Sequence, residues 1–282
     1  MNLDDKIHGI STLLSCSYSH GGSQGTGFFY QALAEADPSK KGGQWRAIEA
    51  LYIVTNRHVV LAKQGTNEIF PNAFTFHLRK NDNGKIVWDA ITLNTEELRK
   101  RALFHPNPNV DVCVISILDL VTERIKSDTN YLNWHAVSRE NFAGQNKINV
   151  DMSTEAVVIG YPRGFYDEMN KFPILKSGKL ASRHGFNFNG NPYFLIDSKL
   201  FPGSSGSIVI SEPTDLVVED GNILHSNEKQ FAFLGVYSGE PFQQSQPIEM
   251  DDMTIIRKSG FNVGIVWYGY LVEEIIQASI HL

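Results

Sequence analysis

The amino-acid sequence predicts an all-β protein whose chain ends in an α-helix. Two features of the composition favour this class. The 282 residues include 17 Phe and 10 Tyr, which are common in strands, and 23 Gly, which supply turns. A third observation is the pattern along the chain, where short apolar or alternating runs are separated by turn-forming residues. We therefore expect many short strands joined by short loops.

The first half of the chain, residues 1–121, contains the first set of strands. The strand-like segments are residues 11–18, 25–30, 51–55, 73–79 and 86–93. The last two flank Asn81-Asp82-Asn83-Gly84, which is typical of a hairpin turn. Asn94 or Thr95 is then expected to cap a short helix, because its side chain can accept the free amides of a first helical turn.

The second half repeats this β pattern. Residues 122–150 are polar and weakly periodic, which predicts a linker, and residues 151–267 hold the second set of strands. The expected strands are residues 156–160, 174–182, 193–198, 207–211, 231–237 and 261–267, with a polar insertion at 212–230. In the tail, residues 268–282, the apolar residues at 271, 272, 275 and 276 have helical spacing.

Charge and targeting signals exclude several classes of protein. The formal net charge is −6, and the longest basic run is Arg99-Lys100-Arg101, so we expect no nucleic-acid partner. Cys16 and Cys113 lie in apolar runs and are expected to be buried free thiols rather than a disulfide. The sequence shows neither a signal peptide nor an apolar run near the ~20 residues of a membrane helix. We expect a cytoplasmic protein without a membrane segment.

The sequence gives no sign of a bound metal or cofactor. The histidines outside residue 58 lack the spacing of metal ligands, and no phosphate loop or dinucleotide fingerprint is present. We therefore expect neither a metal nor a cofactor.

The segment Pro202-Gly203-Ser204-Ser205-Gly206-Ser207 carries the strongest chemical signal. Glycine at 203 permits backbone angles that a β-carbon forbids, so the turn can direct the amides of Gly203 and Ser205 at one point. Two such amides form an oxyanion hole, which stabilises the charged oxygen of a tetrahedral intermediate. The alternative interpretation is an ordinary Gly/Ser-rich hairpin loop.

Two earlier segments supply the partners that a serine nucleophile needs. His58 follows an apolar strand and can remove the serine proton, and Asp111 precedes another strand and can orient the imidazole. Each alone also fits a structural role, His58 as a packed side chain and Asp111 as a turn cap. Their occurrence with Ser205 in the order His, Asp, Ser favours a catalytic triad.

These segments resemble a known family. Thr55-Asn56-Arg57-His58-Val59-Val60 is similar to the histidine motif of HtrA-type and bacterial trypsin-like peptidases, and Asp111-Val112-Cys113-Val114 to their aspartate segment. Gly203-Ser204-Ser205-Gly206-Ser207 resembles their nucleophile loop, with Ser207 where glycine is usual. The resemblance implies a chymotrypsin-like fold of two antiparallel six-stranded β-barrels, with the triad in the cleft between them. No PDZ-like segment follows, so the regulation of HtrA proteases is not expected.

The resemblance also indicates where a substrate would bind. Lys199, six residues before Ser205, occupies the position at the base of the family's primary pocket, and a lysine there would favour an acidic side chain before the scissile bond. The alternative is that Lys199 points to solvent. Tyr237, Ser238 and Gly239 resemble the strand along which substrate backbone pairs.

The sequence thus predicts a serine endopeptidase that acts on proteins or peptides. Ser205 would attack the peptide carbonyl and form an acyl-enzyme, with His58 as base and then acid, and Asp111 orienting it. One alternative is a binding or regulatory module on the same fold with latent or absent activity, and a weaker one is an esterase. A regulatory protein partner is left open, because no residue points to one.

Overall fold

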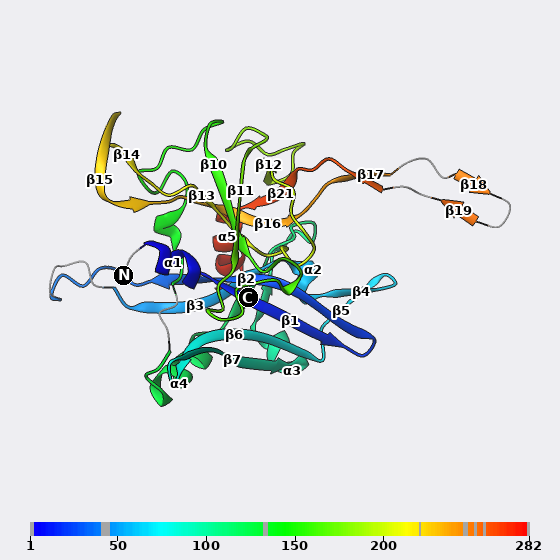
Figure 1. Ribbon diagram of the computed structural model, residues 1–282, viewed down its shortest axis with the longest axis horizontal. Coiled ribbons are helices and arrows are strands. Elements are labelled where there is room, and N and C mark those ends of the chain that lie inside the picture. Colours follow the sequence, from blue (N-terminus) through cyan, green and yellow to red (C-terminus); the bar gives the residue numbers. More distant parts are fainter. Residues whose placement is uncertain are drawn as a thin grey trace.

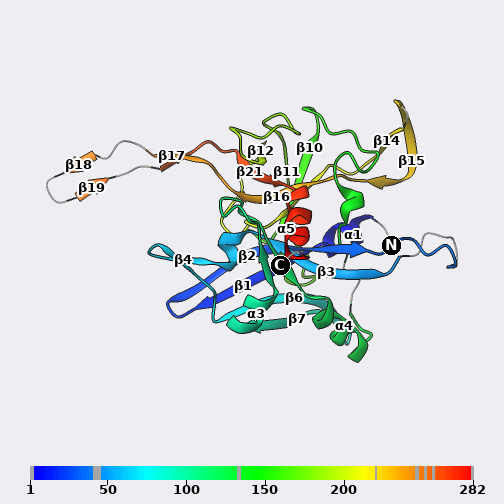
Figure 2. The same ribbon diagram turned by 180° about the vertical axis from the view of Figure 1, so that it is seen from behind.

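The computed structural model describes residues 3–40, 46–131, 135–219, 221–244, 248–250, 253–255 and 258–280. Two β units, one from each half of the chain, lie one above the other, and a helix from the end of the chain lies between them (Figures 1 and 2). The prediction of an all-β protein with a C-terminal helix is confirmed.

The first unit is a seven-stranded antiparallel sheet with the strand order β7-β6-β1-β2-β3-β9-β8. Its inward side chains alternate along the strands, most clearly in β6, because successive residues of a strand point to opposite faces. The strands are β1 Ser11–Tyr18, β2 Gly21–Leu33, β3 Ile48–Thr55, β6 Ala73–Asp82, β7 Lys85–Asn94, β8 Ala102–Phe104 and β9 Cys113–Ser116.

The second unit is a closed six-stranded barrel with the order β10-β11-β12-β21-β16-β13. All neighbouring strands are antiparallel, and β13 is buried along its whole length. The strands are β10 Glu155–Gly160, β11 Ile174–Leu180, β12 Tyr193–Asp197, β13 Ile208–Ser211, β16 Phe233–Gly239 and β21 Gly264–Tyr268. The second half therefore forms the predicted six-stranded barrel. The first half is instead a seven-stranded sheet whose end strands, β7 and the three-residue β8, are not paired with each other in the described part of the chain.

Hairpins extend from the two units. The predicted insertion at 212–230 is a hairpin of β14 and β15, and a second long arm leaves the barrel after β16 (Figure 1). The hairpin strands are β4 Ala62–Gln64, β5 Asn67–Ile69, β14 Thr214–Glu219, β15 Asn222–Gln230, β17 Phe242–Gln244, β18 Ile248–Met250, β19 Met253–Ile255 and β20 Lys258–Gly260.

Helices connect the strands and close the two ends of the chain. They are α1 Leu3–Gly9, α2 Arg57–Val60, α3 Thr95–Arg101, α4 Leu118–Ser127 and α5 Tyr270–Ile280, with 3-10 turns η1 Arg139–Asn141 and η2 Pro162–Gly164. The expected cap of α3 is present, because the Asn94 side chain accepts the Glu97 amide while the Glu97 carboxylate accepts the Asn94 amide. No helix in the described part of the chain is long and apolar enough to cross a membrane.

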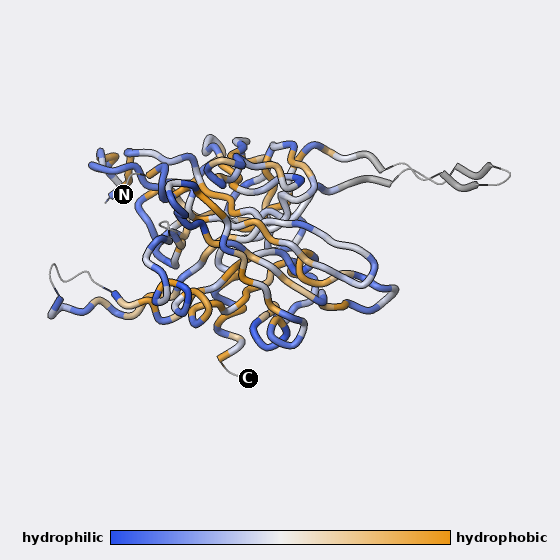
Figure 3. Tube along the Cα trace, turned by 60° about the horizontal axis from the view of Figure 1, so that its bottom comes forward, coloured by the Kyte–Doolittle hydropathy of each residue, from blue (hydrophilic) through white to orange (hydrophobic). Residues whose placement is uncertain are grey.

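The ends of the chain each join the opposite unit. Ile7 of α1 belongs to the apolar core that the barrel shares with the facing strands of the sheet, and the Ser11 hydroxyl donates to the Ile159 carbonyl of the barrel. In return α5 packs against β8 and β9 of the first sheet, where Glu273 accepts from the Tyr30 hydroxyl. Figure 3 shows that apolar residues gather in the strands at the centre of the molecule, whereas the outer loops are mostly polar. The two units are thereby held in a fixed relation.

Two elements differ from the sequence-based expectation. Helix α1 at residues 3–9 was not anticipated, and α4 begins at Leu118, so the region expected to be a linker from residue 122 starts inside a helix. In α4 only Val121 is buried, so its sequence carries a weak periodic signal. The rest of residues 122–150 is mostly irregular, with η1 as its only other helical turn among the described residues.

Candidate active site

His58 and Asp111 meet at the end of the first sheet. His58 sits in the one-turn helix α2 directly after β3, where the buried Val59 and Val60 anchor the turn and leave the imidazole half exposed, at 49%. Asp111 lies between the buried Val110 and Val112 just before β9. Its carboxylate accepts two hydrogen bonds from His58, one from the backbone N–H at 3.0 Å and one from Nδ1 at 2.6 Å.

This contact fixes the proton on the imidazole. A carboxylate oxygen can only accept, so Nδ1 of His58 carries the hydrogen and Nε2 of the neutral ring keeps its lone pair. His58 is thus held in the tautomer of a general base, with Nε2 as the acceptor.

Ser238 joins the two units at this point. Its hydroxyl, at the end of the barrel strand β16, donates to the same Asp111 oxygen that His58 Nδ1 uses, at 2.5 Å. Its carbonyl accepts the hydroxyl of Ser205 at 2.8 Å. His58, Asp111, Ser238 and Ser205 therefore form one chain of hydrogen bonds across the interface between the sheet and the barrel.

The loop that carries Ser205 is a tight turn built on two glycines. Gly203 and Gly206 have φ of +89° and +84°, a region that side chains with a β-carbon rarely adopt. A β-carbon at Gly203 would lie 2.6 Å from the Arg163 nitrogen, and one at Gly206 would lie 2.1 Å from the Thr26 carbonyl oxygen. Glycine is therefore required at both positions for backbone angle and for space.

The backbone of this loop leaves two amides free. The carbonyls of Pro202, Gly203, Ser204 and Ser205 accept from Arg163 N–H, the Thr26 hydroxyl, Ser207 N–H and Thr26 N–H, at 2.7 to 3.0 Å. In a trans peptide the carbonyl of one residue and the N–H of the next residue point in opposite directions. A carbonyl that is held by a hydrogen-bond donor therefore directs the N–H of the next residue away from that donor. Within the described residues, the amides of Gly203 and Ser205 have no acceptor.

Three residues to which the sequence assigned no role of their own hold this arrangement. Thr26 binds the loop through its backbone and its hydroxyl, and its carbonyl accepts from the Thr55 hydroxyl at 2.7 Å. The Asn56 side-chain amide donates to the Asp111 carbonyl at 2.7 Å, which fixes the aspartate backbone. All three side chains are fully buried. Thr55 and Asn56 belong to the histidine motif, whereas no sequence signal pointed to Thr26.

The predicted substrate strand has an open edge beside Ser205. Tyr237 is paired on both sides, by the backbone of Gly206 and Ser207 and by Val266, but the pairing with β13 ends there. Burial, with a smaller contribution from Glu240, raises the pKa of the Tyr237 hydroxyl to about 12, so this side chain stays neutral. Ser238 and Gly239 follow without a partner from β13 among the described residues.

Lys199 lies apart from this hydrogen-bonded group. Its side chain is exposed and forms no ion pair in the part of the chain that the structure describes, while its backbone carbonyl accepts from the Lys176 ammonium at 2.5 Å. The structure thus places Lys199 on the surface near the nucleophile loop, and its effect on specificity stays a prediction.

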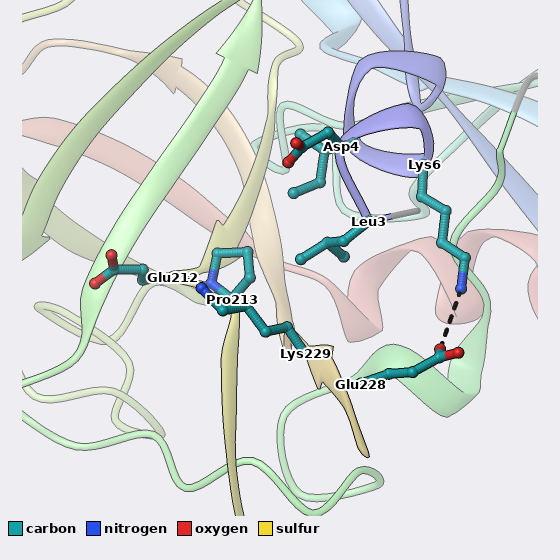
Figure 4. A pocket seen from close by; sticks show the side chains of 8 residues that line it. Leu3, Asp4, Lys6, Glu212, Pro213, Glu228 and Lys229 are labelled. Atoms are coloured by element: carbon teal, nitrogen blue, oxygen red, sulfur yellow. Dashed lines mark ion pairs between the residues drawn. The ribbon is translucent and has the colours of Figure 1, made fainter. Parts of the chain in front are cut away.

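A large hollow in the described part of the chain lies away from the predicted site residues. It has a volume of about 610 Å³ and lies between α1 and the start of the β14–β15 hairpin, where Lys6 faces Glu228 at 4.0 Å (Figure 4). It contains none of the predicted site residues. Over the described ranges, no group of three His, Cys, Asp or Glu side chains is placed to hold a metal ion.

Comparison with known proteins defines the class of this chain. Residues 25–218, more than half of the sequence, match the model of the trypsin-like peptidase domain. The chain therefore belongs to the trypsin-like peptidase family, as its three motifs predicted. The sequence matches none of the curated proteins with which it was compared.

Several solved structures have a similar course of the chain at low sequence identity. The HtrA-type protease AlgW with a tripeptide is 13% identical over 99% of this chain and 62% of its own, with a TM-score of 0.49. The chain thus spans less than two thirds of that protease. The thermostable serine protease AL20 from an extremophilic microorganism is 12% identical over 98% and 99% of the two chains, with a TM-score of 0.49. Protease Anisep from Arthrobacter nicotinovorans is 13% identical over 97% and 96%, with a TM-score of 0.47.

Proposed function

We propose that this trypsin-like peptidase is a serine endopeptidase that uses His58, Asp111 and Ser205. The observation that carries the proposal is the hydrogen bond from His58 Nδ1 to Asp111, which leaves Nε2 as a proton acceptor, while Ser238 links the same carboxylate to Ser205. A serine hydroxyl is a weak nucleophile at neutral pH and needs such a base. The two free amides of Gly203 and Ser205 supply the donors that a tetrahedral oxyanion requires.

The reaction would begin with an exchange of hydrogen bonds. In the resting enzyme the Ser205 hydroxyl donates to the Ser238 carbonyl. A substrate backbone that pairs along Ser238 and Gly239 brings an N–H that competes for this carbonyl, and the displaced hydroxyl can turn to Nε2 of His58. Ser205 would then attack the carbonyl carbon as His58 takes its proton, and His58 would return that proton to the leaving amine. Water would hydrolyse the acyl-enzyme by the same route.

Cleavage of an unfolded protein tests this function. The wild-type chain and the Ser205→Ala variant are incubated with reduced, denatured protein, and new amino termini are mapped by mass spectrometry. We expect new termini with the wild type and none with Ser205→Ala, which is close to serine in size. Equal cleavage by both proteins would contradict the assignment of Ser205.

The hydrogen bond from the Ser205 hydroxyl to the Ser238 carbonyl favours a second candidate, a latent binding module with a protease fold, because it holds the hydroxyl away from His58. In that case the wild type would neither cleave protein nor react with a fluorophosphonate, while the fold stays intact. An esterase would hydrolyse activated esters and leave all proteins uncut.

A further inference from the structure

A cluster of positive charge surrounds one exposed ring beside the nucleophile loop. Phe201 is 42% exposed, and the Arg163 guanidinium lies 5.3 Å and the Lys176 ammonium 5.1 Å from the centre of its ring. Both cations approach the ring because its π-electrons attract positive charge. The Lys176 ammonium also donates to the backbone carbonyl of Lys199, which holds Lys176 beside the chain that leads to Phe201.

The cluster is fixed to the oxyanion turn. Arg163 has a φ of +52°, which is unusual for a side chain with a β-carbon, and its N–H donates to the Pro202 carbonyl at 2.7 Å. The Phe201 carbonyl accepts from Ser204 N–H at 3.1 Å. The backbone of Arg163 is thus held against Gly203, so the arginine side chain starts from a set position beside the nucleophile loop.

The charges of this cluster are not neutralised within the described chain. No carboxylate there forms an ion pair with Arg163, Lys176 or Lys199. Residues 161–204 contain six Lys or Arg and three Asp or Glu, although the whole chain carries a net charge of −6. Of those three acids, Asp167 accepts hydrogen bonds from its own loop, and Asp197 lies opposite Lys179 in the barrel. Two unneutralised cations on one ring repel each other, and a carboxylate between them relieves this repulsion.

The two ends of the nucleophile loop face different neighbours. At the Gly206 end lies the strand with Tyr237 and Ser238, and at the Gly203 end lies Arg163. A substrate whose residues before the scissile bond pair along Ser238 and Gly239 continues, after that bond, toward Gly203 and the cluster. An acidic side chain there meets both cations.

We propose that Arg163, Lys176 and Phe201 form a subsite for an acidic side chain on the carboxyl-terminal side of the scissile bond. The proposal rests on the endopeptidase function given above and assigns the specificity of the same site. It differs from the expectation for Lys199, which concerns the residue before the bond. Exposed ion pairs are worth little each, so we expect a preference of about two- to fivefold for Asp or Glu over Asn or Gln per cation.

A peptide library that pairs each acid with its amide tests the subsite. The wild type should cleave preferentially where an acidic residue follows the scissile bond. This preference should be smaller in Arg163→Gln and in Lys176→Gln and should be largely kept in Arg163→Lys. In Arg163→Glu it should change to a preference for Lys or Arg. The acid-to-amide ratio is compared within each variant, so a general loss of activity cancels. Lys179→Gln, on the same strand β11 with the same change in charge, is the matched control and should keep the wild-type ratio.

A second measurement does not need catalysis. Immobilised Ser205→Ala protein, with and without Arg163→Gln, captures the same library, and the bound peptides are sequenced. Acidic peptides should be enriched only when Arg163 is present. Cleavage or capture without enrichment of acidic residues after the scissile bond would overturn the proposed subsite and leave the endopeptidase function standing.

An acidic preference before the scissile bond that persists in Arg163→Gln and in Lys176→Gln would likewise overturn the subsite, in favour of Lys199. Absence of cleavage with acidic capture retained would refute the endopeptidase function alone.

Discussion

At the scale of single residues, the proposed chemistry depends on one carboxylate that accepts three hydrogen bonds. Asp111 receives the backbone N–H and the Nδ1–H of His58 and the hydroxyl of Ser238. These contacts orient the carboxylate from both structural units, so the imidazole tautomer depends on the interface between them. Ser238 is accordingly a positioning residue, and its carbonyl serves Ser205 as well.

The substitution Ser238→Ala removes the hydroxyl and keeps the carbonyl. A hydrogen bond to a charged group contributes about 1.5–3 kcal/mol, so we expect kcat/KM to fall by about ten- to a hundredfold. Because the carbonyl that faces the substrate remains, the loss should appear in kcat more than in KM. Steady-state kinetics on one peptide measures both constants, and a loss confined to KM would show that Ser238 acts only in substrate binding.

The sequence predicted the motif residues of the site but assigned Ser238 to substrate binding alone. The hydroxyl of Ser238 reaches Asp111 across 127 residues of chain, and no local spacing encodes such a contact. The roles of Thr26 and Asn56 were not predicted for a related reason. Their role is to saturate backbone groups of the loop and of Asp111, which only the assembled fold brings near them.

At the scale of elements, the decisive piece is the turn from Gly203 to Gly206. Its carbonyls are tied to Thr26, Arg163 and Ser207, and these anchors leave the two amides free. The turn therefore acts as a unit, and a change at one glycine should affect both amides.

Gly206→Ala tests this. A β-carbon there would lie 2.1 Å from the Thr26 carbonyl oxygen and 2.3 Å from the Thr55 hydroxyl, at a φ of +84°. The turn must shift, so we expect a loss of stability of about 1–3 kcal/mol and a loss of nearly all activity. Urea unfolding and peptide cleavage measure the two effects. Gly221→Ala is the control, because it also has a positive φ but open space around it. Full activity in Gly206→Ala would contradict the role given to the turn.

The strands were predicted more reliably than the helices. Alternation in β6 and β7 and the turn at Asn83-Gly84 are local signals, and the observed hairpin extends them by only a few residues. Helix α1 was missed because it has seven residues with only Ile7 and Gly9 buried, so its apolar face is too short to show a period. Packing against the second unit supports it, and that contact is non-local.

At the scale of the whole molecule, the exchange of the chain ends ties the active site to global stability. Ile7 of α1 and the buried face of α5 belong to one apolar core between the sheet and the barrel, so the relation between His58 and Ser205 depends on both ends of the chain. His135 lies where these parts meet, since its backbone N–H donates to the Gly9 carbonyl and its neighbour Ala136 is buried in the core of the sheet.

This histidine predicts a pH dependence of stability. Burial, with a smaller contribution from the nearby Lys6 charge, lowers the pKa of His135 from 6.5 to about 4. The unfolded chain therefore binds an additional proton between these values, and the free energy of unfolding should fall as the pH drops from about 6.5 to 4. The loss of unfolding free energy that His135 contributes over this pH range is about 3 kcal/mol at most. His77, whose pKa burial also lowers, acts in the same direction.

Urea unfolding between pH 7.5 and 4 measures this slope in wild type and in His135→Gln. The variant should show a shallower decrease, whereas His20→Gln, which changes an exposed histidine, should follow the wild type. Equal slopes in wild type and His135→Gln would show that His135 does not titrate as its burial implies.

The central claim is that Ser205 is a nucleophile activated by the His58–Asp111 pair. The most direct test is covalent labelling with a fluorophosphonate, followed by intact mass and peptide mapping of wild type, Ser205→Ala and Asp111→Asn. We expect one adduct per chain on Ser205, no adduct in Ser205→Ala, and labelling slowed by at least a hundredfold in Asp111→Asn, because the amide can hold the imidazole in the wrong tautomer. A folded wild-type protein that takes up no label, or that carries the label on another residue, would contradict the claim.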